Sequence, residues 1–377
     1  MILTLRAQRA VAAMVVAASL WACSGAQQGP RAQALPPANA GALDKMVRAL
    51  NEGRAADKGS RSVELLRQAL QEDPSLWEAR YNLGVLLADR GELGQAEKEL
   101  ATAASLAPNA EDVAVALGEV RRRRGEPKDA AQGLQKFVEL YPKADAARGV
   151  LVGALREAGD YAQALEQARQ ILVRRPNDPS ALAELALTYV AKGEVDTAEL
   201  LSAEALKAAQ PSAAAERGAG LIALEQGDDA SAFRHFARAT EIDPKDHTSQ
   251  INIGNVLLKA GVYNKAEQHF RAVLELTPDD EGATLGLAAA LRGQGARENK
   301  APYLEAEKLL KALLERQPND TQAIFNLGVL YARFLNQTAD GSELMKRFLS
   351  EAAEDDPARA LAQQIVSEGN APPASKN

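Results

Sequence analysis

The sequence is poor in the residues that build disulfides, metal sites and aromatic clusters. Its 377 residues include one cysteine and three histidines, and aromatic residues make up 4% of the chain. One cysteine cannot form an internal disulfide, and three histidines without further thiols do not make a ligand cluster. We therefore expect no metal and no cofactor. The low aromatic content, with abundant alanine, favours closely packed helices over sheets.

An excess of positive charge and the common catalytic signatures are also missing. The formal net charge is −7 at pH 7. Because nucleic acid and anionic lipid surfaces are bound through basic patches, we expect no nucleic-acid partner and no electrostatic attachment to lipid. No glycine-rich phosphate loop and no Gly-x-Ser-x-Gly motif occurs in the sequence. We predict that there are no catalytic residues and that the protein is not an enzyme.

One run of four arginines, Arg121 to Arg124, admits two interpretations. The run closes an expected helix, where cations stabilise the C-terminal end of the helix dipole. Alternatively, it forms a docking patch for an acidic partner.

The N-terminus carries the features of a secretory signal. Arg6 and Arg9 precede an uncharged, mostly apolar run over residues 10–20, which is too short to be relied on as a membrane span. The run ends at Leu-Trp-Ala-Cys, which resembles the bacterial lipobox that is cleaved before a lipid-modified cysteine. We predict a lipoprotein signal peptide over residues 1–22 and a lipid on Cys23. A soluble secreted protein and an uncleaved anchor are the alternatives.

The residues after the signal have the composition of a linker. Residues 23–42 are rich in Gly, Pro, Gln and Ala, and Arg31 is their single charge. We predict a flexible tether that begins at the lipidated cysteine. By resemblance to bacterial lipoproteins, Ser24 implies sorting to the outer membrane. We expect the protein to be lipid-anchored there and to face the periplasm.

Glycine and alanine recur along the chain at an interval of 34 residues. Since glycine is about 7% of an average chain, chance does not explain seven glycines in register. A glycine can end a helix in the left-handed backbone conformation, and a small residue lets two helices approach closely. The glycines in register are Gly91, Gly125, Gly159, Gly193, Gly227, Gly261 and Gly295, and the alanines are Ala96, Ala130, Ala164, Ala198, Ala232 and Ala266.

A 34-residue period with this punctuation resembles the tetratricopeptide repeat. The stretch RYNLGVLLADRGELGQAEKELATAASLAPN carries most of the signature, at Leu83, Gly84, Gly91, Ala96, Leu100, Ala103 and Pro108. The resemblance implies an all-α fold, a superhelical solenoid of antiparallel helix pairs. One pair cannot bury its apolar face alone, so neighbouring pairs stack into a continuous core.

The predicted array covers residues 43–354 in about eight to nine repeats. The first repeat is degenerate and has Ser62 where alanine is expected. The eighth repeat is longer than the others, because extra residues after Gly295 lengthen the turn between its helices.

The chain after the array is expected to end in one more helix. We predict a capping helix over residues 355–368, with Asp356 as its N-cap. A disordered tail is predicted over residues 369–377.

In the family that the chain resembles, the first helix of each repeat lines the concave face and contacts bound peptides. Carried over, the resemblance implies a partner-binding groove that is mixed at first and apolar from Leu187 to Leu258. Packing of some of these side chains against neighbouring helices is the alternative. The predicted groove residues are Tyr81, Val85, Ala88, Arg122, Leu187, Val190, Arg217, Leu221, Leu224, Ile251, Asn255, Leu258 and Phe325.

These features together predict a membrane-anchored, non-enzymatic scaffold that binds protein partners of the cell envelope and helps to assemble an envelope machine. The build resembles tetratricopeptide lipoproteins of bacterial gliding-motility complexes, and the Ala- and Arg-rich composition fits this type best. Assembly factors for type IV pilus secretins and adaptors that regulate peptidoglycan enzymes are the alternatives.

Overall fold

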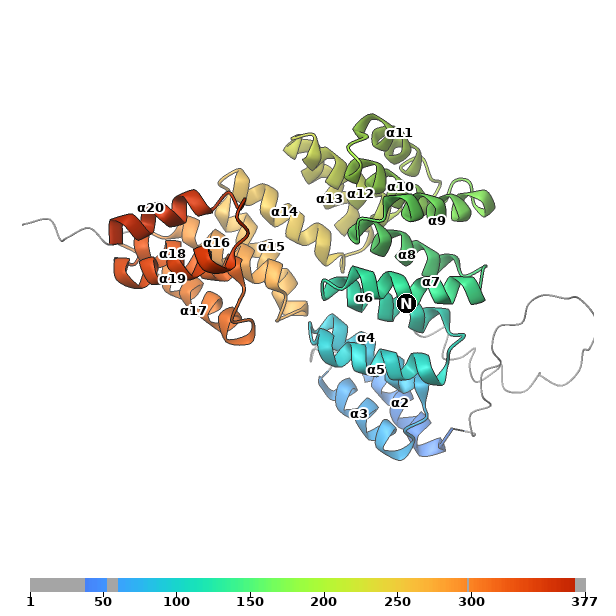
Figure 1. The fold of residues 1–377 in the computed structure, drawn as a ribbon. Helices are drawn as coiled ribbons and strands as arrows, with labels where there is room; N and C mark the ends of the chain where they lie inside the picture. The colour runs from blue at the N-terminus through green and yellow to red at the C-terminus, as the bar shows by residue number, and fades with distance from the viewer. Residues whose placement is uncertain (1–37, 53–59, 297, 370–377) are drawn as a thin grey trace, which may run out of the picture. The chain divides into compact units, whose positions relative to one another are not determined.

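The structure, a computed structural model, describes residues 38–52, 60–296 and 298–369. These residues form nineteen helices and no strand, and the predicted all-α fold class is confirmed (Figure 1). The predicted signal peptide and Cys23 lie outside the described residues, as do residues 370–377 of the predicted tail. The helices are α2 (Ala40–Glu52), α3 (Ser60–Glu72), α4 (Trp77–Asp89), α5 (Leu93–Leu106), α6 (Glu111–Arg123), α7 (Pro127–Leu140), α8 (Asp145–Glu157), α9 (Tyr161–Arg174), α10 (Pro179–Ala191), α11 (Val195–Ala205), α12 (Ala213–Glu225), α13 (Asp229–Ile242), α14 (His247–Lys259), α15 (Tyr263–Leu276), α16 (Glu281–Gln294), α17 (Ala301–Arg316), α18 (Thr321–Arg333), α19 (Thr338–Glu351) and α20 (Arg359–Gly369).

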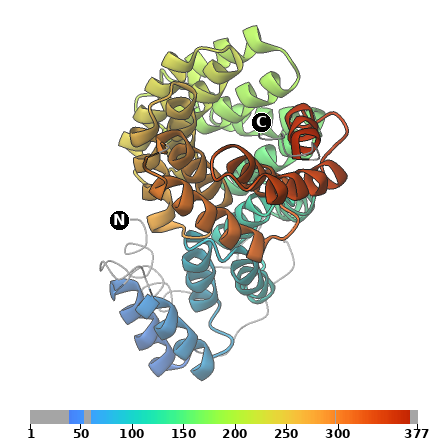
Figure 2. The ribbon, with the colours of Figure 1, turned by 90° about the vertical axis from the view of Figure 1, so that its left-hand side faces the viewer.

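The chain divides into two compact units, unit 1 up to Ile222 and unit 2 from Ala223, and the boundary falls within α12. Inside each unit, consecutive helices pack as antiparallel pairs, which Figures 1 and 2 show from two directions. In unit 1 the pairs are α2–α3, α4–α5, α6–α7, α8–α9 and α10–α11. In unit 2 they are α14–α15, α16–α17 and α18–α19, with α20 packed on α19. None of the described helices is both long enough and apolar enough to span a bilayer.

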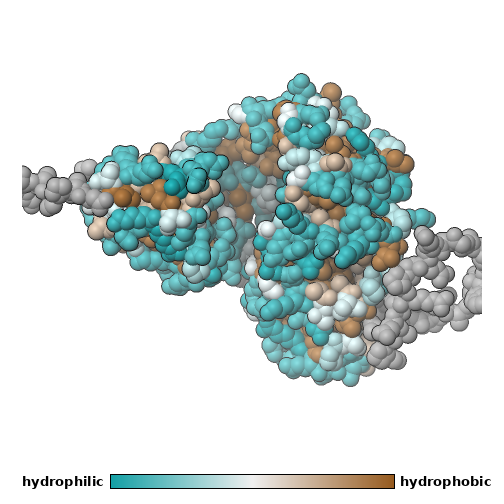
Figure 3. All heavy atoms as spheres, viewed as in Figure 1, coloured by the Kyte–Doolittle hydropathy of each residue, from teal (hydrophilic) through white to brown (hydrophobic). Residues whose placement is uncertain are grey.

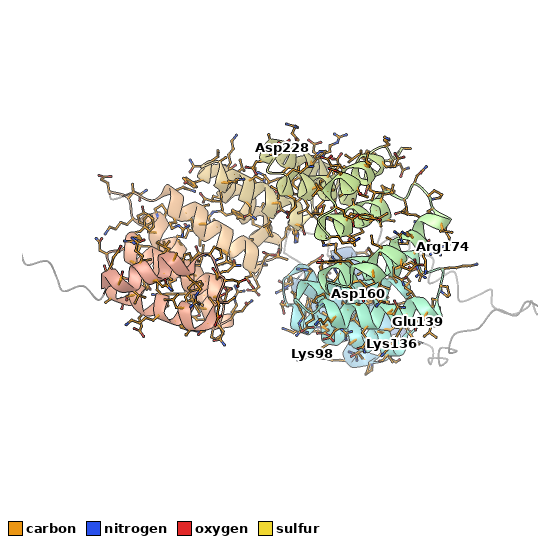
Figure 4. The ribbon with its side chains drawn as sticks, turned by 45° about the horizontal axis from the view of Figure 1, so that its top comes forward. Lys98, Lys136, Glu139, Asp160, Arg174 and Asp228 are labelled. Atoms are coloured by element: carbon orange, nitrogen blue, oxygen red, sulfur yellow. The ribbon has the colours of Figure 1, made fainter. Side chains whose placement is uncertain are left out.

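The first helices of the pairs from α4 to α16 begin 34 residues apart, and α18 begins 40 residues after α16. Helices α4, α6, α8, α10, α12, α14, α16 and α18 start at residues 77, 111, 145, 179, 213, 247, 281 and 321. Aspartates fix several helix starts, because a side-chain oxygen at the N-cap satisfies a backbone N–H of the first turn. Figure 4 labels two of them, Asp160 and Asp228, which accept from the N–H groups of Gln163 at 3.2 Å and Ser231 at 2.9 Å.

Six of the seven glycines in register have a left-handed backbone conformation, with φ between 73° and 82°. At Gly91 the turn is closed by the N–H of Glu92, which donates to the carbonyl of Leu87 at 2.9 Å. Gly295 is the exception, since its φ is −65° and it ends α16 in an extended conformation. It is glycine for another reason: the ring of Tyr303 occupies the space that a Cβ would need. The longer turn of this repeat therefore has its own geometry.

Small residues mark the crossing of the two helices in a pair. The alanines in register and Ala306 are at most 1% exposed. In the degenerate first repeat, Ser62 replaces alanine and is also fully buried. Its hydroxyl donates to the carbonyl of Ala49 on α2 at 2.9 Å, so the polar atom is satisfied inside the pair.

Two predicted boundaries need correction. Helix α2 begins at Ala40, inside the predicted tether, because Asn39 accepts from the N–H groups of Gly41 and Ala42 at 2.8 and 3.2 Å and Ala42 packs into the core. At the other end, α20 begins at Arg359, later than predicted. The Asp356 carboxylate accepts instead from the N–H of Ala358 at 2.8 Å, in the turn before the helix.

Candidate protein-binding surface

The first helices of neighbouring repeats contact one another inside each unit. In unit 1, α6 contacts α4 and α8, and α8 contacts α10; in unit 2, α16 contacts α14 and α18. The second helices of neighbouring repeats make at most marginal contacts in the described part of the chain. Because helices on the inner side of a curved stack lie closer together, the first helices form the inner layer of each unit. The candidate protein-binding surface consists of the side chains that these first helices present to solvent on the inner side of each unit.

Arg122 is the centre of a charged network on the inner layer of unit 1. Its Nε and Nη2 donate to the two carboxylate oxygens of Glu157 at 3.0 and 2.5 Å, and its Nη1 donates to both oxygens of Glu119 at 3.1 Å. A two-pronged pairing of this kind is the strong form of the arginine–carboxylate contact. The guanidinium lies against Gly153, where a Cβ would come 2.8 Å from Cζ. The glycine thus gives the arginine the space to join α6 to α8.

A second arginine continues the network to the next repeat. Arg156 Nη2 lies 3.3 Å from Glu184 Oε2 on α10 and 3.7 Å from Glu157 Oε1. Three successive first helices are therefore linked by alternating charges. We call this network the Arg–Glu ladder, and its members are Glu119, Arg122, Arg156, Glu157 and Glu184.

The ladder shifts the protonation equilibria of its members. Burial raises the pKa of Glu119; Arg122 opposes this shift, and the charges of Glu184 and Glu157 add to it. Burial alone would lower the pKa of Arg122, but its hydrogen bonds to Glu157 and the charge of Glu119 raise it. The charges of the ladder are thus largely matched within the protein, with Arg122 kept as a cation.

Most of the four arginines, Arg121 to Arg124, form ion pairs with carboxylates of the same chain. Arg121 pairs with Glu97 at 2.9 Å, Arg124 pairs with Glu97 and with Glu126, and Arg122 belongs to the ladder. Arg123 is exposed. The four side chains therefore do not form one free basic patch.

The described residues contain no group of three or more His, Cys, Asp or Glu side chains placed to hold a metal ion. His269 illustrates the structural use of the histidines, because its Nδ1 lies 2.7 Å from the side-chain oxygen of Gln250 on the neighbouring helix.

Comparison with known protein families identifies the repeat. One tetratricopeptide-repeat model matches residues 54–120, and a second matches residues 115–179, 183–247 and 251–299. Together these segments cover more than half of the chain. The chain belongs to the tetratricopeptide-repeat family. No curated protein sequence matched this tetratricopeptide chain.

Solved structures are similar to this tetratricopeptide protein. The crystal structure of the APC/C hetero-tetramer Cut9-Hcn1 is similar with a TM-score of 0.56 and 14% identity, over 87% of this chain and 62% of that chain. The present chain thus spans less than two thirds of that relative. PilW, a widely conserved type IV pilus biogenesis factor, is similar with a TM-score of 0.44 and 19% identity, over 58% of this chain and all of that chain. The likeness to Cut9-Hcn1 concerns the fold alone.

In unit 1 of this tetratricopeptide protein, the predicted groove residues are partly used for packing. Tyr81 packs against the N-terminal core cluster, and Leu187 and Val190 pack around the cluster of Ala186, Ala198 and Ile222. The prediction that Ala88 lines the groove is wrong. Ala88 is 7% exposed, because it faces the core from α4. Val85, Arg122, Arg217 and Leu221 are half-buried, and the charge of Arg217 acts on Glu119.

In unit 2, the predicted residues differ in their access to solvent. Asn255 is exposed, and Leu224, Ile251 and Leu258 are half-buried. Phe325 packs on Phe348, with ring centroids 5.1 Å apart, in the core cluster of α18 and α19.

The predicted apolar groove, from Leu187 to Leu258, is therefore less open than expected. None of its members is among the large hydrophobic residues that the described chain leaves exposed, and its residues are divided between the two units. Figure 3 shows that hydrophilic residues cover most of the visible face of each unit.

Sequence reasoning missed Glu157 and Glu184 as members of the inner surface. Both lie on first helices, but outside the positions carried over from the family resemblance. The sequence did contain a signal for them. Arg122 and Arg156 are one repeat apart on neighbouring first helices, and two such positive charges on the inner layer are stabilised when carboxylates lie between them. The offset between neighbouring helices decides which carboxylates these are.

Proposed function

We propose that this tetratricopeptide scaffold is held at the outer membrane by a lipid on Cys23 and binds proteins of the cell envelope on the inner layers of its units. Tetratricopeptide proteins are protein-interaction scaffolds, and this chain is one by its repeat. The observation that carries the proposal is the inner layer of first helices, on which the Arg–Glu ladder lies together with half-buried apolar residues such as Val85 and Leu221. Such a surface offers both charge and apolar contact to a segment of a partner.

The anchor is supported by the sequence around Cys23. The apolar run, the small residue Ala22 and the sole cysteine form a lipobox-like junction. Several acyl chains, each contributing about 0.8 kcal/mol per buried CH₂, hold a protein stably on a bilayer. Residues after Cys23 would act as the spacer between the membrane and the array.

The machine that we propose first is a gliding-motility complex. The support is the resemblance of a long, Ala- and Arg-rich array behind a lipobox to the lipoproteins of these complexes. A deletion strain with lost motility and normal cell shape would support this machine. Normal motility with altered shape would favour an adaptor of peptidoglycan enzymes instead.

Site-specific cross-linking tests the binding surface. A photo-reactive residue at Leu221, on the inner layer, should capture a partner in living cells. The matched control carries it at Lys136, which is exposed on the second helix α7 and is labelled in Figure 4. Equal capture from both positions, or capture from neither, would contradict the proposed surface.

A further inference from the structure

Helix α11 of unit 1 carries a leucine where the other second helices from α3 to α15 carry a polar side chain. Leu200 is 74% exposed, although α11 is a second helix and lies outside the inner layer. The residues at the same position of the repeat are all exposed, and they are Glu64, Lys98, Gln132, Glu166, Arg234 and Gln268. The repeat itself therefore does not explain why this position holds a leucine.

Leu200 belongs to an exposed face that runs along α11. Ala203 and Leu206 follow it at intervals of three residues, and residues three apart on a helix lie on the same side. Leu206 directly follows the last residue of α11 and is 38% exposed. The opposite side of the helix packs into the core, where Ala198 and Ala205 are at most 1% exposed. The middle of the exposed face is thus apolar and points away from the core.

The early end of α11 is what exposes Leu206. Helix α11 has 11 residues, and the other second helices that the structure describes have 13 to 16. At the same position of the repeat, Val138 lies inside α7 and is 3% exposed. Leucine, lysine and alanine, which occupy positions 206–209, are strong helix formers, so local propensity does not account for the early end.

Acidic side chains border the apolar residues of this face. Asp196 and Glu199 precede Leu200 and Ala203 by one turn, and Glu204 follows Leu200 by one turn. All three carboxylates are exposed. The base of the face is Lys207, which pairs with Glu204 at 2.8 Å. The face therefore carries three negative charges and one positive charge.

This charge distinguishes between the occupants that such a face could have. Exposed apolar surface bordered by polar residues is typical of an interaction site. A second copy of the face would bring carboxylates against carboxylates, and an anionic bilayer would repel them. A protein segment with Lys or Arg beside a large apolar residue matches both the charge and the apolar middle of the face.

We propose that the outer face of α11, centred on Leu200, binds a segment of a partner protein in which Lys or Arg residues flank a large apolar residue. The apolar side chain of the partner covers Leu200 and Leu206, and its basic side chains meet Asp196 and Glu199. This surface lies outside the inner layer of first helices. The inference thus adds a second protein-binding surface and does not depend on the proposed one.

Parallel peptide selections on the full chain test this surface. A displayed library of short randomised peptides is selected on the wild type and on Leu200→Gln, and both enriched pools are sequenced. We expect a class of peptides that is lost on the variant and has Lys or Arg within one turn of a large apolar residue. For synthetic members of this class, Leu200→Gln should weaken binding about 10-fold. Asp196→Lys, which takes no part in the selection, should weaken it about 5-fold.

Leu304→Gln is the matched control for Leu200→Gln. Leu304 is 55% exposed on the second helix α17 of unit 2, so the same substitution removes an exposed leucine outside the proposed face. It should leave binding of the peptide class unchanged. Since the three substituted side chains are exposed, the variants should melt like the wild type, which circular dichroism measures. If Leu200→Gln unfolds, Asp196→Lys carries the test.

Several results would overturn the inference. They are two selections with the same peptides, a lost class without basic residues, equal binding of that class to the wild type and Asp196→Lys, and equal weakening by Leu304→Gln. Self-association of the wild type that Leu200→Gln abolishes, measured by analytical ultracentrifugation, would assign the face to a second copy instead. Partner capture from position 221 concerns the inner layer alone, so failure there leaves these results unaffected.

Discussion

The ring of Phe270 packs directly against the backbone of Gly254, where a Cβ would lie 2.6 Å from the ring atom Cζ. The same ring meets Gly286 on the other side, at the position of a second missing Cβ. Phe270 is fully buried between α14 and α16. Three consecutive helices of unit 2 are thus joined by one aromatic side chain and two glycines.

Gly286→Ala should destabilise unit 2. The added methyl group overlaps the ring of Phe270, and overpacking of this kind costs about 1–3 kcal/mol. Gly282→Ala, on the same helix, is the matched control, because the nearest atom to its Cβ is at 3.5 Å. It should be neutral or stabilising, since alanine has the higher helix propensity. Urea unfolding of both variants measures the difference, and equal midpoints would contradict the packing argument.

Replacing a turn glycine by alanine should destabilise the protein, whereas replacing a helix glycine should not, even where the added Cβ meets no other atom in either case. Gly159 and Gly149 both have no atom within 4 Å of an added Cβ, but Gly159 has φ +82° and Gly149 lies inside α8. Gly159→Ala should cost about 1–2 kcal/mol through the left-handed backbone. Gly149→Ala should stabilise by up to about 1 kcal/mol. If both variants melt alike, the backbone conformation is not what selects glycine in these turns.

Much of the fold, and less of the surface, could be predicted from the sequence. The spacing from Gly91 to Ala96 repeats along the chain because each repeat needs the same turn and the same helix crossing. Gly295 breaks that register, and only the position of Tyr303 shows why it is glycine. The carboxylate partners of Arg122 and Arg156 could not be predicted, because the offset between neighbouring helices decides that Glu157 and Glu184 lie beside these arginines.

The stabilising effect of Glu307 should depend on pH. Hydrogen bonds from Lys311 at 2.6 Å and Tyr331 at 2.9 Å hold the pKa of the Glu307 carboxyl below its ordinary value of 4.5. A carboxylate whose pKa is lowered in the folded state stabilises the fold at pH values above its ordinary pKa. This stabilisation is lost as the pH falls through the folded-state pKa. Glu307→Gln should cost about 0.5–1.5 kcal/mol at pH 7. The difference from the wild type should shrink below pH 4.5, and a constant difference would refute this account.

Cys23→Ala should release the protein from membranes. Without the thiol there is no site for the lipid, and no described helix can span a bilayer in its place. Fractionation of cells that express each form, followed by detection of the chain in membrane and soluble fractions, measures the change. Ser24→Ala keeps the cysteine and is the control, which should remain with the membranes. Sedimentation of Cys23→Ala with the outer membrane would defeat the proposed anchor.

The Arg–Glu ladder should contribute measurable stability to unit 1. Glu157→Gln keeps the side-chain shape but removes the charge that Arg122 grips with two nitrogens. Hydrogen bonds to charged groups contribute about 1.5–3 kcal/mol, and Arg122 retains Glu119, so we expect a loss near the lower end of this range. The loss should diminish only slightly with salt, because the Arg122 side chain is 17% exposed and partly buried pairs are weakly screened.

Glu139→Gln is the matched control for the ladder variant. Glu139 is exposed on the second helix α7 and is labelled in Figure 4. Within the described part of the chain, its carboxylate accepts only from Gln135 on its own helix. The same substitution there should change the free energy of unfolding by less than about 0.5 kcal/mol. If Glu157→Gln is as mild as this control, the ladder is not a structural link. Its charges would then be available to a partner at little cost to the fold.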